Sequence, residues 1–147
     1  DPLFIAGHWT VQLIERAGGR HPLNPTAAPP NFGAAAGLQQ SARRAGKSIA
    51  VPPDVFAATG PQWLIIAPCG LCLEDAARAA EALRSQAWFG DLPAVRAGRV
   101  AIVDGNQMFN RPGPRLVDAF EWLVAWLQRR PELVPQEFPV RYWPSRA

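Results

Sequence analysis

Short apolar runs alternate along the chain with segments of helical periodicity. The runs at 3–6, 63–67 and 100–103 are continuously apolar and have the length of buried strands. Each is followed by a turn signal: Gly7, the Pro68-Cys69-Gly70 segment, and Asp104-Gly105. The pattern therefore predicts three buried strands, each leading into a turn.

Helical spacing follows these turns. Apolar residues between Trp9 and Ala17 indicate a first helix, which the Gly18-Gly19 pair ends. A short helix begins at Pro52-Pro53, and a longer amphipathic one covers 73–83, where apolar residues recur at i, i+3, i+4, i+7 and i+10. A final helix is expected from Arg115 to about Gln128.

Alternation of strands and helices with short connections predicts an α/β fold. The expected architecture is a mostly parallel sheet with helices on both faces. Two stretches break the pattern. Residues 20–48 show turn and extended signals and predict a long surface excursion, and the tail from Arg130 has four more prolines and little periodicity.

Size and charge narrow the function classes. The chain has 147 residues, enough for one domain with its own core, and 48% of them are hydrophobic. No apolar run reaches 18 residues, so no membrane-spanning helix is expected. The net charge is +3, from 15 basic and 12 acidic residues that are scattered rather than clustered, so nucleic acid is not an expected partner.

The turns after the strands are the places to look for a ligand site, because ligands of open α/β sheets bind beyond the carboxyl ends of the strands. Three turns, at 7–9, 68–70 and 104–111, would gather at one edge of the predicted sheet. The residues that they offer to a ligand are His8, Trp9, Cys69, Gly70, Phe109, Asn110 and Arg111.

The third turn is the richest in recognition chemistry. Arg111 and Arg115 flank a Pro-Gly-Pro segment, and planar cationic groups on a rigid backbone suit a carboxylate, amide or phosphate. Phe109, like Trp9 in the first turn, offers a face for stacking. The alternative is that Pro-Gly-Pro only turns the chain and that the arginines are ordinary surface residues.

Cys69 and Cys72 form a CxxC motif at a strand-to-helix turn, the placement seen in thioredoxin-like redox sites. The helix N-terminus would favour the thiolate of the nearer cysteine. The alternative is that both are small apolar side chains in a loop. His8 and His21 do not complete a zinc site at any recognised spacing, and no nucleophile elbow, phosphate loop or dinucleotide fingerprint is present. No enzymatic activity and no catalytic cofactor or metal is expected.

Several segments together resemble a known family. The chain carries GHW at 7–9, LIERAGG at 13–19, PCG at 68–70, LPAVRAGRV at 92–100 and FNRPGPRLVD at 109–118. These segments resemble the carboxy-terminal lobe of cobalamin-binding proteins of ABC importers. The wider group is the periplasmic-binding-protein class that carries iron chelates, haem and metal ions, and the similarity covers about residues 1–128.

The resemblance implies a fold and a function. Residues 1–128 would form the carboxy-terminal ligand-binding lobe and 129–147 a Pro-rich tail, with the amino-terminal lobe and a linking helix expected before residue 1. The protein would bind a corrinoid or related metal chelate in the cleft between two lobes, as the extracytoplasmic (periplasmic) component of an importer whose permease is its partner. Cobalamin would be a ligand, not a cofactor.

The resemblance also assigns roles to single residues. Trp9 and the turn at 109–111 match positions that face the ligand, and Asp54 matches an acidic residue that docks on the transporter's arginines. The alternative, without any docking role, is that Asp54 only complements the helix dipole. Ser48 stands where some cobalamin binders have tryptophan, and Cys72 has no counterpart in the pattern. Two other functions stay open: a thiol-disulfide redox module using Cys69 and Cys72, and a corrinoid scavenger that meets no transporter.

Overall fold

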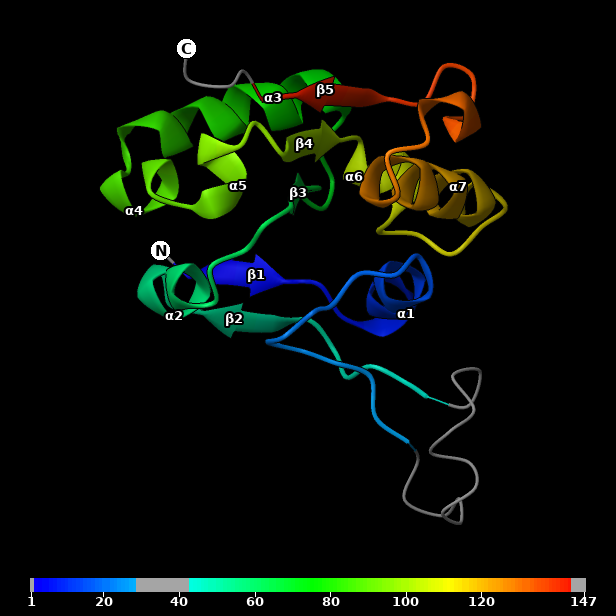
Figure 1. Cartoon of the computed structure of the whole chain (residues 1–147), viewed down its shortest axis with the longest axis horizontal. Helices are drawn as coiled ribbons and strands as arrows, with labels where there is room; N and C mark the ends of the chain where they lie inside the picture. Colours follow the sequence, from blue (N-terminus) through cyan, green and yellow to red (C-terminus); the bar gives the residue numbers. More distant parts are fainter. Residues whose placement is uncertain (1, 29–42, 144–147) are drawn as a thin grey trace. The chain divides into compact units, whose positions relative to one another are not determined.

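The computed structural model describes residues 2–28 and 43–143, and the chain divides into two compact units (Figure 1). The first unit comprises Asp1–Pro52 and Phe120–Val134, and the second comprises Pro53–Ala119 and Pro135–Ala147. The middle of the predicted surface excursion, residues 29–42, lies outside the described residues.

The first unit begins with the strand and helix that the apolar pattern predicts. These are β1 (Leu3–Ile5) and α1 (His8–Arg16), and the chain turns after α1 at Gly18, whose φ is +94°. A strand that the pattern did not predict, β2 (Ile49–Val51), pairs antiparallel with β1, with Leu3 opposite Val51. The excursion between α1 and β2 therefore brings the chain back beside its own beginning.

Polar contacts anchor the two ends of the excursion to each other. Ala27 and Arg44 exchange backbone hydrogen bonds of 2.8 and 2.9 Å in an isolated antiparallel bridge. The Glu15 carboxylate on α1 accepts hydrogen bonds from both the backbone N–H and the hydroxyl of Thr26, which is buried. Arg43 donates to the same hydroxyl over 3.0 Å. These contacts tie the described ends of the excursion to α1.

The second unit is built around a three-stranded sheet. Its strands, in the order β3-β4-β5, are β3 (Leu64–Ile66), β4 (Val100–Val103) and β5 (Val140–Tyr142). β3 and β4 run parallel, and β4 and β5 run antiparallel. Its helical elements are α2 (Pro53–Ala58), α3 (Leu73–Glu81), η3 (Ala82–Ser85), α4 (Ala87–Gly90), α5 (Pro93–Arg96) and α6 (Gly105–Met108).

The prediction of a mostly parallel sheet is wrong for the part of the chain that the structure describes. The α/β character is confirmed, but of the three strand pairs only β3 with β4 is parallel. A parallel pair needs a long crossover, and α3 to α5 supply one between these two strands. The other two pairs are antiparallel because the excursion and the tail each return the chain in the opposite direction.

The core of the second unit lies around β4. All four residues of this strand are buried, as expected for a continuously apolar run, whereas β3 is only half-buried. Ala76 and Ala80 of α3 are also buried, and α3 packs against β4 and β5. Small side chains on this face let the helix approach the sheet closely.

The tail completes this core. Sequence periodicity indicated no element after Arg130, but the tail contains η4 (Pro131–Leu133) and strand β5. Trp143 follows β5 and is 6% exposed. Its ring meets Phe89 edge-on at 5.3 Å between centroids, and its backbone N–H donates to the Val100 carbonyl. Arg84 lies over the same indole, 4.6 Å from the ring centroid.

The final predicted helix is confirmed as α7 (Arg115–Leu127). Trp122 is fully buried and stacks on Trp126, with centroids 5.1 Å apart and ring planes 17° apart. Beyond α7, the Gln128 side chain donates to the Ala17 carbonyl over 2.9 Å, which ties the end of this helix to the end of α1. None of the helices described here has the length and apolarity needed to cross a bilayer.

We predict that Trp143→Ala destabilises the chain by about 3–5 kcal/mol, because it removes a large buried side chain and leaves a cavity. Tyr142→Ala is the matched control: the neighbouring aromatic is 51% exposed, and its removal should cost less than about 1 kcal/mol. Urea unfolding followed by tryptophan fluorescence measures both. Equal losses would show that the tail does not complete the core.

Candidate functional site

The turns that follow the two parallel strands lie against each other. Ala67 comes directly after β3, and Asn110 belongs to the turn after β4. The Asn110 side-chain amide donates to the Ala67 carbonyl over 3.2 Å. The structure thus brings together two of the three turns that the sequence placed at one edge, and the third, at 7–9, belongs to the first unit.

Gly105 allows this close approach. A Cβ atom at this position would lie 2.6 Å from the Ala67 carbonyl oxygen, 2.8 Å from its carbon and 2.5 Å from the Asn110 amide nitrogen. Two of these neighbours are backbone atoms, which cannot rotate away. The joint between the two turns therefore requires glycine at 105.

A buried carboxylate holds the turn after β4 in shape. Asp104 is 3% exposed and caps α6: one carboxylate oxygen accepts from the Gln107 backbone N–H at 2.9 Å, and the other from its side-chain amide at 2.8 Å. The Gln107 amide oxygen in turn accepts from Arg115 at 2.8 Å. Sequence reasoning did not assign Asp104 or Gln107 a role, although an Asp directly after a strand is an N-cap signal.

Arg111 is exposed on this turn, and its Nε donates to the Asn106 side-chain oxygen over 3.1 Å. Phe109 is different from what the sequence suggested. Its ring is 2% exposed, so it packs inside the protein and presents no stacking face to solvent. Phe109 therefore supports the turn, while Arg111 is the side chain that the turn presents.

Cys69, Gly70 and Cys72 lie in the turn between β3 and α3. Gly70 has a φ of +78°, a left-handed conformation that favours glycine. Both cysteines are exposed and free. Cys72 was expected inside the first helical turn, but it is the N-cap residue, one position before α3 begins.

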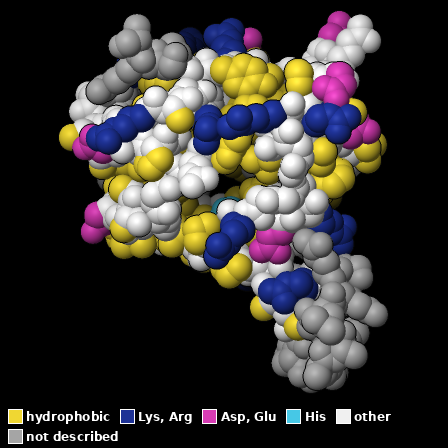
Figure 2. All heavy atoms as spheres, in the orientation of Figure 1, with side chains coloured by type: hydrophobic (Ala, Val, Ile, Leu, Met, Phe, Trp, Pro, Cys, Tyr) yellow, Lys and Arg dark blue, Asp and Glu magenta, His cyan; other side chains and the backbone are white. Residues whose placement is uncertain are grey.

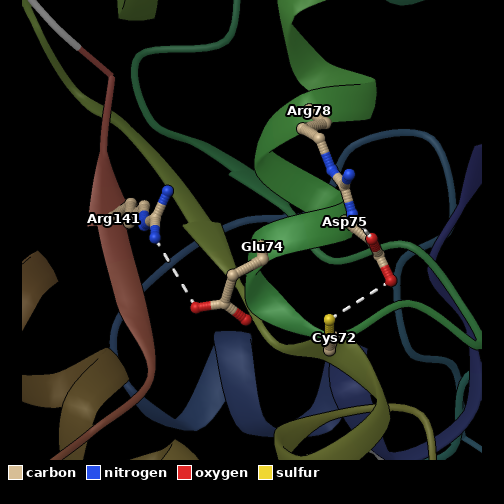
Figure 3. A network of polar contacts seen from close by, with 5 residues as sticks. All are labelled: Cys72, Glu74, Asp75, Arg78 and Arg141. Atoms are coloured by element: carbon tan, nitrogen blue, oxygen red, sulfur yellow. Dashed lines mark hydrogen bonds and ion pairs between the residues drawn. The ribbon is translucent and has the colours of Figure 1, made fainter.

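A polar network surrounds Cys72 (Figure 3). Its thiol donates to the Asp75 carboxylate over 3.3 Å, and Arg78 pairs with the same carboxylate from one turn further along α3. The hydrogen bonds from Cys72 and Arg78 lower the pKa of Asp75 below its ordinary value. Glu74 points to the other side and pairs with Arg141 of β5 over 3.5 Å.

The first-unit turn holds His8 and Trp9 in a constrained backbone. His8 is exposed and has a φ of +53°, which is uncommon for a residue with a side chain. Its N–H donates to the Gly46 carbonyl over 2.8 Å, and Gly7 sits so close to Lys47 and Ser48 that a Cβ would come within 2.4 Å of their backbone. The His8 and Trp9 rings lie 5.7 Å apart, tilted by 32°.

Other chemistry-bearing groups are dispersed. Within residues 2–28 and 43–143, no group of three or more His, Cys, Asp or Glu side chains could hold a metal ion. His21 is partly buried, and burial lowers its pKa. Asp54 is exposed in the first turn of α2. On the face that Figure 2 shows, basic side chains are spread among apolar and neutral ones, and several have an acidic side chain beside them.

We predict that Gly105→Ala costs about 1–3 kcal/mol of unfolding free energy, because the new methyl group is forced against the Ala67 carbonyl. Gly113→Ala is the matched control, since a Cβ at Gly113 would meet no atom within 4 Å. Thermal and urea unfolding of both variants decide the matter. A Gly105→Ala protein as stable as Gly113→Ala would contradict the close joint.

Comparison with known proteins bears on the fold. No family model and no curated protein matches the chain. Among solved structures, the crystal structure of a periplasmic heme binding protein from Pseudomonas aeruginosa is similar over 92% of this chain, with a TM-score of 0.54 and 23% sequence identity. The aligned region covers 40% of that chain. Over most of its length, this chain therefore shares the fold of part of a periplasmic heme-binding protein.

Proposed function

We propose that this chain is a non-enzymatic binding lobe for a corrinoid or related metal chelate, acting in the substrate-binding component of an ABC importer. The observation that carries the proposal is the fold shared with a periplasmic heme-binding protein over 92% of the chain. The same similarity supports an extracytoplasmic, periplasmic location. The sequence resemblance favours a corrinoid, and the structural similarity favours haem.

The described side chains suit such a ligand. Trp9 is half-buried beside an exposed His8, so part of its indole is accessible and could offer an edge or face to a flat macrocycle. Arg111 is exposed, and its guanidinium can bind a carboxylate or amide oxygen on the ligand's rim. Cys69, Gly70 and Asn110 would contribute the surface of the turns at 67–70 and 109–111.

Preorganisation supports the proposal as much as composition does. Asp104 caps α6, which leads into the turn that carries Arg111, and Asn110 joins this turn to Ala67. A side chain presented from a fixed turn loses less conformational freedom when a ligand binds. In this proposal the residues bind or orient the ligand, and none of them takes part in a chemical reaction.

The test is a fluorescence or calorimetric titration of the chain with cobalamin, haem and a ferric siderophore. Because the chain aligns with only 40% of the heme-binding protein, we expect weak binding, with a Kd of roughly 1 μM or above, which corresponds to about −8 kcal/mol. Bound macrocycle should quench tryptophan fluorescence. Binding of one chelate class and of none of the others would identify the ligand.

Trp9→Ala and Arg111→Ala should each weaken binding by about 1–3 kcal/mol, mostly through faster dissociation. Arg96→Ala is the matched control, because Arg96 is also an exposed arginine of the second unit but pairs with Asp91 over 2.7 Å. It should bind like the unaltered chain. Unchanged affinity in both Trp9→Ala and Arg111→Ala, or no binding of any chelate, would refute the site.

Asp54 tests the transport half of the proposal. An exposed carboxylate at the start of α2 could pair with basic residues of a permease. In a reconstituted importer, Asp54→Ala should leave chelate affinity unchanged and lower the uptake rate, whereas Asp91→Ala, which removes another exposed carboxylate, should change neither. Equal losses of affinity and uptake would argue against docking. Chelate binding without any effect of Asp54 on uptake would favour the scavenger function.

A further inference from the structure

The chelate-binding proposal leaves the second cysteine unexplained. Cys69 and Cys72 are both exposed and free, and only Gly70 and Leu71 separate them. Gly70 takes a left-handed φ of +78°, and the space where its Cβ would be has no atom within 4 Å. The turn that carries the two thiols is therefore sharply bent and uncrowded at its centre, which favours the approach of thiols three residues apart.

The two thiols have different surroundings. Cys72 is the N-cap of α3, and its Sγ donates to Asp75 over 3.3 Å (Figure 3). Cys69 precedes Gly70 in the turn, outside the helix, so the positive end of the α3 dipole lies nearer to Cys72, and the contact with the Asp75 carboxylate opposes its effect. An anionic reagent that approaches Cys72 therefore meets the Asp75 carboxylate, whose charge is only partly offset by its ion pair with Arg78.

We propose that Cys69 and Cys72 form a dithiol that exchanges with small disulfides, with Cys69 as the attacking thiol and Cys72 as the resolving one. In the first step, the Cys69 thiolate attacks one sulfur of the small disulfide. A mixed disulfide forms on Cys69, and one small thiolate leaves.

In the second step, Cys72 gives up its proton to solvent or to the departing thiolate, and its sulfur attacks Cys69 Sγ. The mixed disulfide breaks, the Cys69–Cys72 disulfide forms, and the second small thiol leaves. The protein is oxidised by two electrons, and the small disulfide is reduced to two thiols. This reaction does not depend on the proposed chelate binding.

The turn geometry agrees with ring closure by neighbouring thiols. A disulfide needs Cα atoms about 4.4–6.8 Å apart, and Cys69 and Cys72 are separated by only two residues, in a connection that bends at Gly70. β3 ends at Ile66 and α3 begins at Leu73, so both cysteines lie in the connection and not within either element. Closure should therefore leave the sheet and α3 intact.

The first experiment treats the folded chain with oxidised glutathione and follows free thiols and intact mass. We expect both thiols to disappear, the mass to fall by two hydrogens, and no glutathione to stay attached. Circular dichroism should show that the helices persist. Stable glutathione adducts on both cysteines, no reaction, or closure only in denaturant would overturn the proposal.

The second experiment tests the order of attack with single-cysteine variants. Cys72→Ser should trap one glutathione on Cys69, and it should react roughly fivefold faster than Cys69→Ser, because like-charge repulsion from Asp75 slows the reaction of Cys72. Adding Asp75→Asn to Cys69→Ser should remove most of this difference. Adding Glu74→Gln instead is the matched control, since Glu74 pairs with Arg141 and not with the thiol.

Equal rates for the two single-cysteine variants would overturn the assigned order. A Glu74→Gln effect as large as that of Asp75→Asn would show that general surface charge, and not the Asp75 contact, sets the rate. A neutral aromatic disulfide serves as a second reagent. With it, the fivefold difference should shrink, because the charge repulsion is absent.

Discussion

The candidate site of the second unit depends on one close contact, where the chain after β4 passes the carbonyl of Ala67. Gly105 has no side chain to hold the two segments apart, and Asn110 uses the same carbonyl as its hydrogen-bond acceptor. Because β3 and β4 are parallel neighbours, their following turns emerge at the same edge. The contact holds the segment that follows β3 against the turn that carries Asn110 and Arg111.

Around this contact, hydrophobic burial stabilises the unit, and polar caps hold the turn after β4 in shape. The core under β4 is closed by Trp143 from the tail, and it supplies the hydrophobic stabilisation of the unit. The Asp104 carboxylate accepts a hydrogen bond from a backbone N–H at the start of α6. It also accepts one from the Gln107 side chain, which in turn accepts from Arg115 at the start of α7. The exposed ion pairs of the unit, such as Arg96 with Asp91, contribute little to stability by comparison.

The apolar pattern predicted elements better than it predicted their pairing. Leu3–Ile5, Leu64–Ile66 and Val100–Val103 are strands where continuous apolar runs indicated them, and the final helix begins at Arg115 as expected. Direction of pairing is set by the return path of the chain, which local periodicity does not encode. β2 and β5 were missed because each follows a stretch rich in turn signals, and β5 also carries the charged Arg141 at its centre.

The parts of the site that depend on local turn conformation could be predicted from the sequence. The parts that depend on tertiary packing could not. Gly70 was placed in its turn correctly, since Pro and Gly punctuate the chain there. Phe109 was expected to face a ligand but is buried, because an aromatic residue in a turn has the same sequence signal whether it faces solvent or the core. Gly105 was visible only as a turn residue, as its close approach to Ala67 is a tertiary contact.

The central claim is that a metal chelate binds the turns that follow the strands. Amide NMR shift mapping during titration with haem and with cobalamin tests this claim most directly. Shifts should concentrate at residues 67–70 and 105–111 of the second unit, while α4 and α5 of the same unit stay unchanged. Shifts that centre on α4, α5 or the exposed face of α3, with none in these turns, would contradict it.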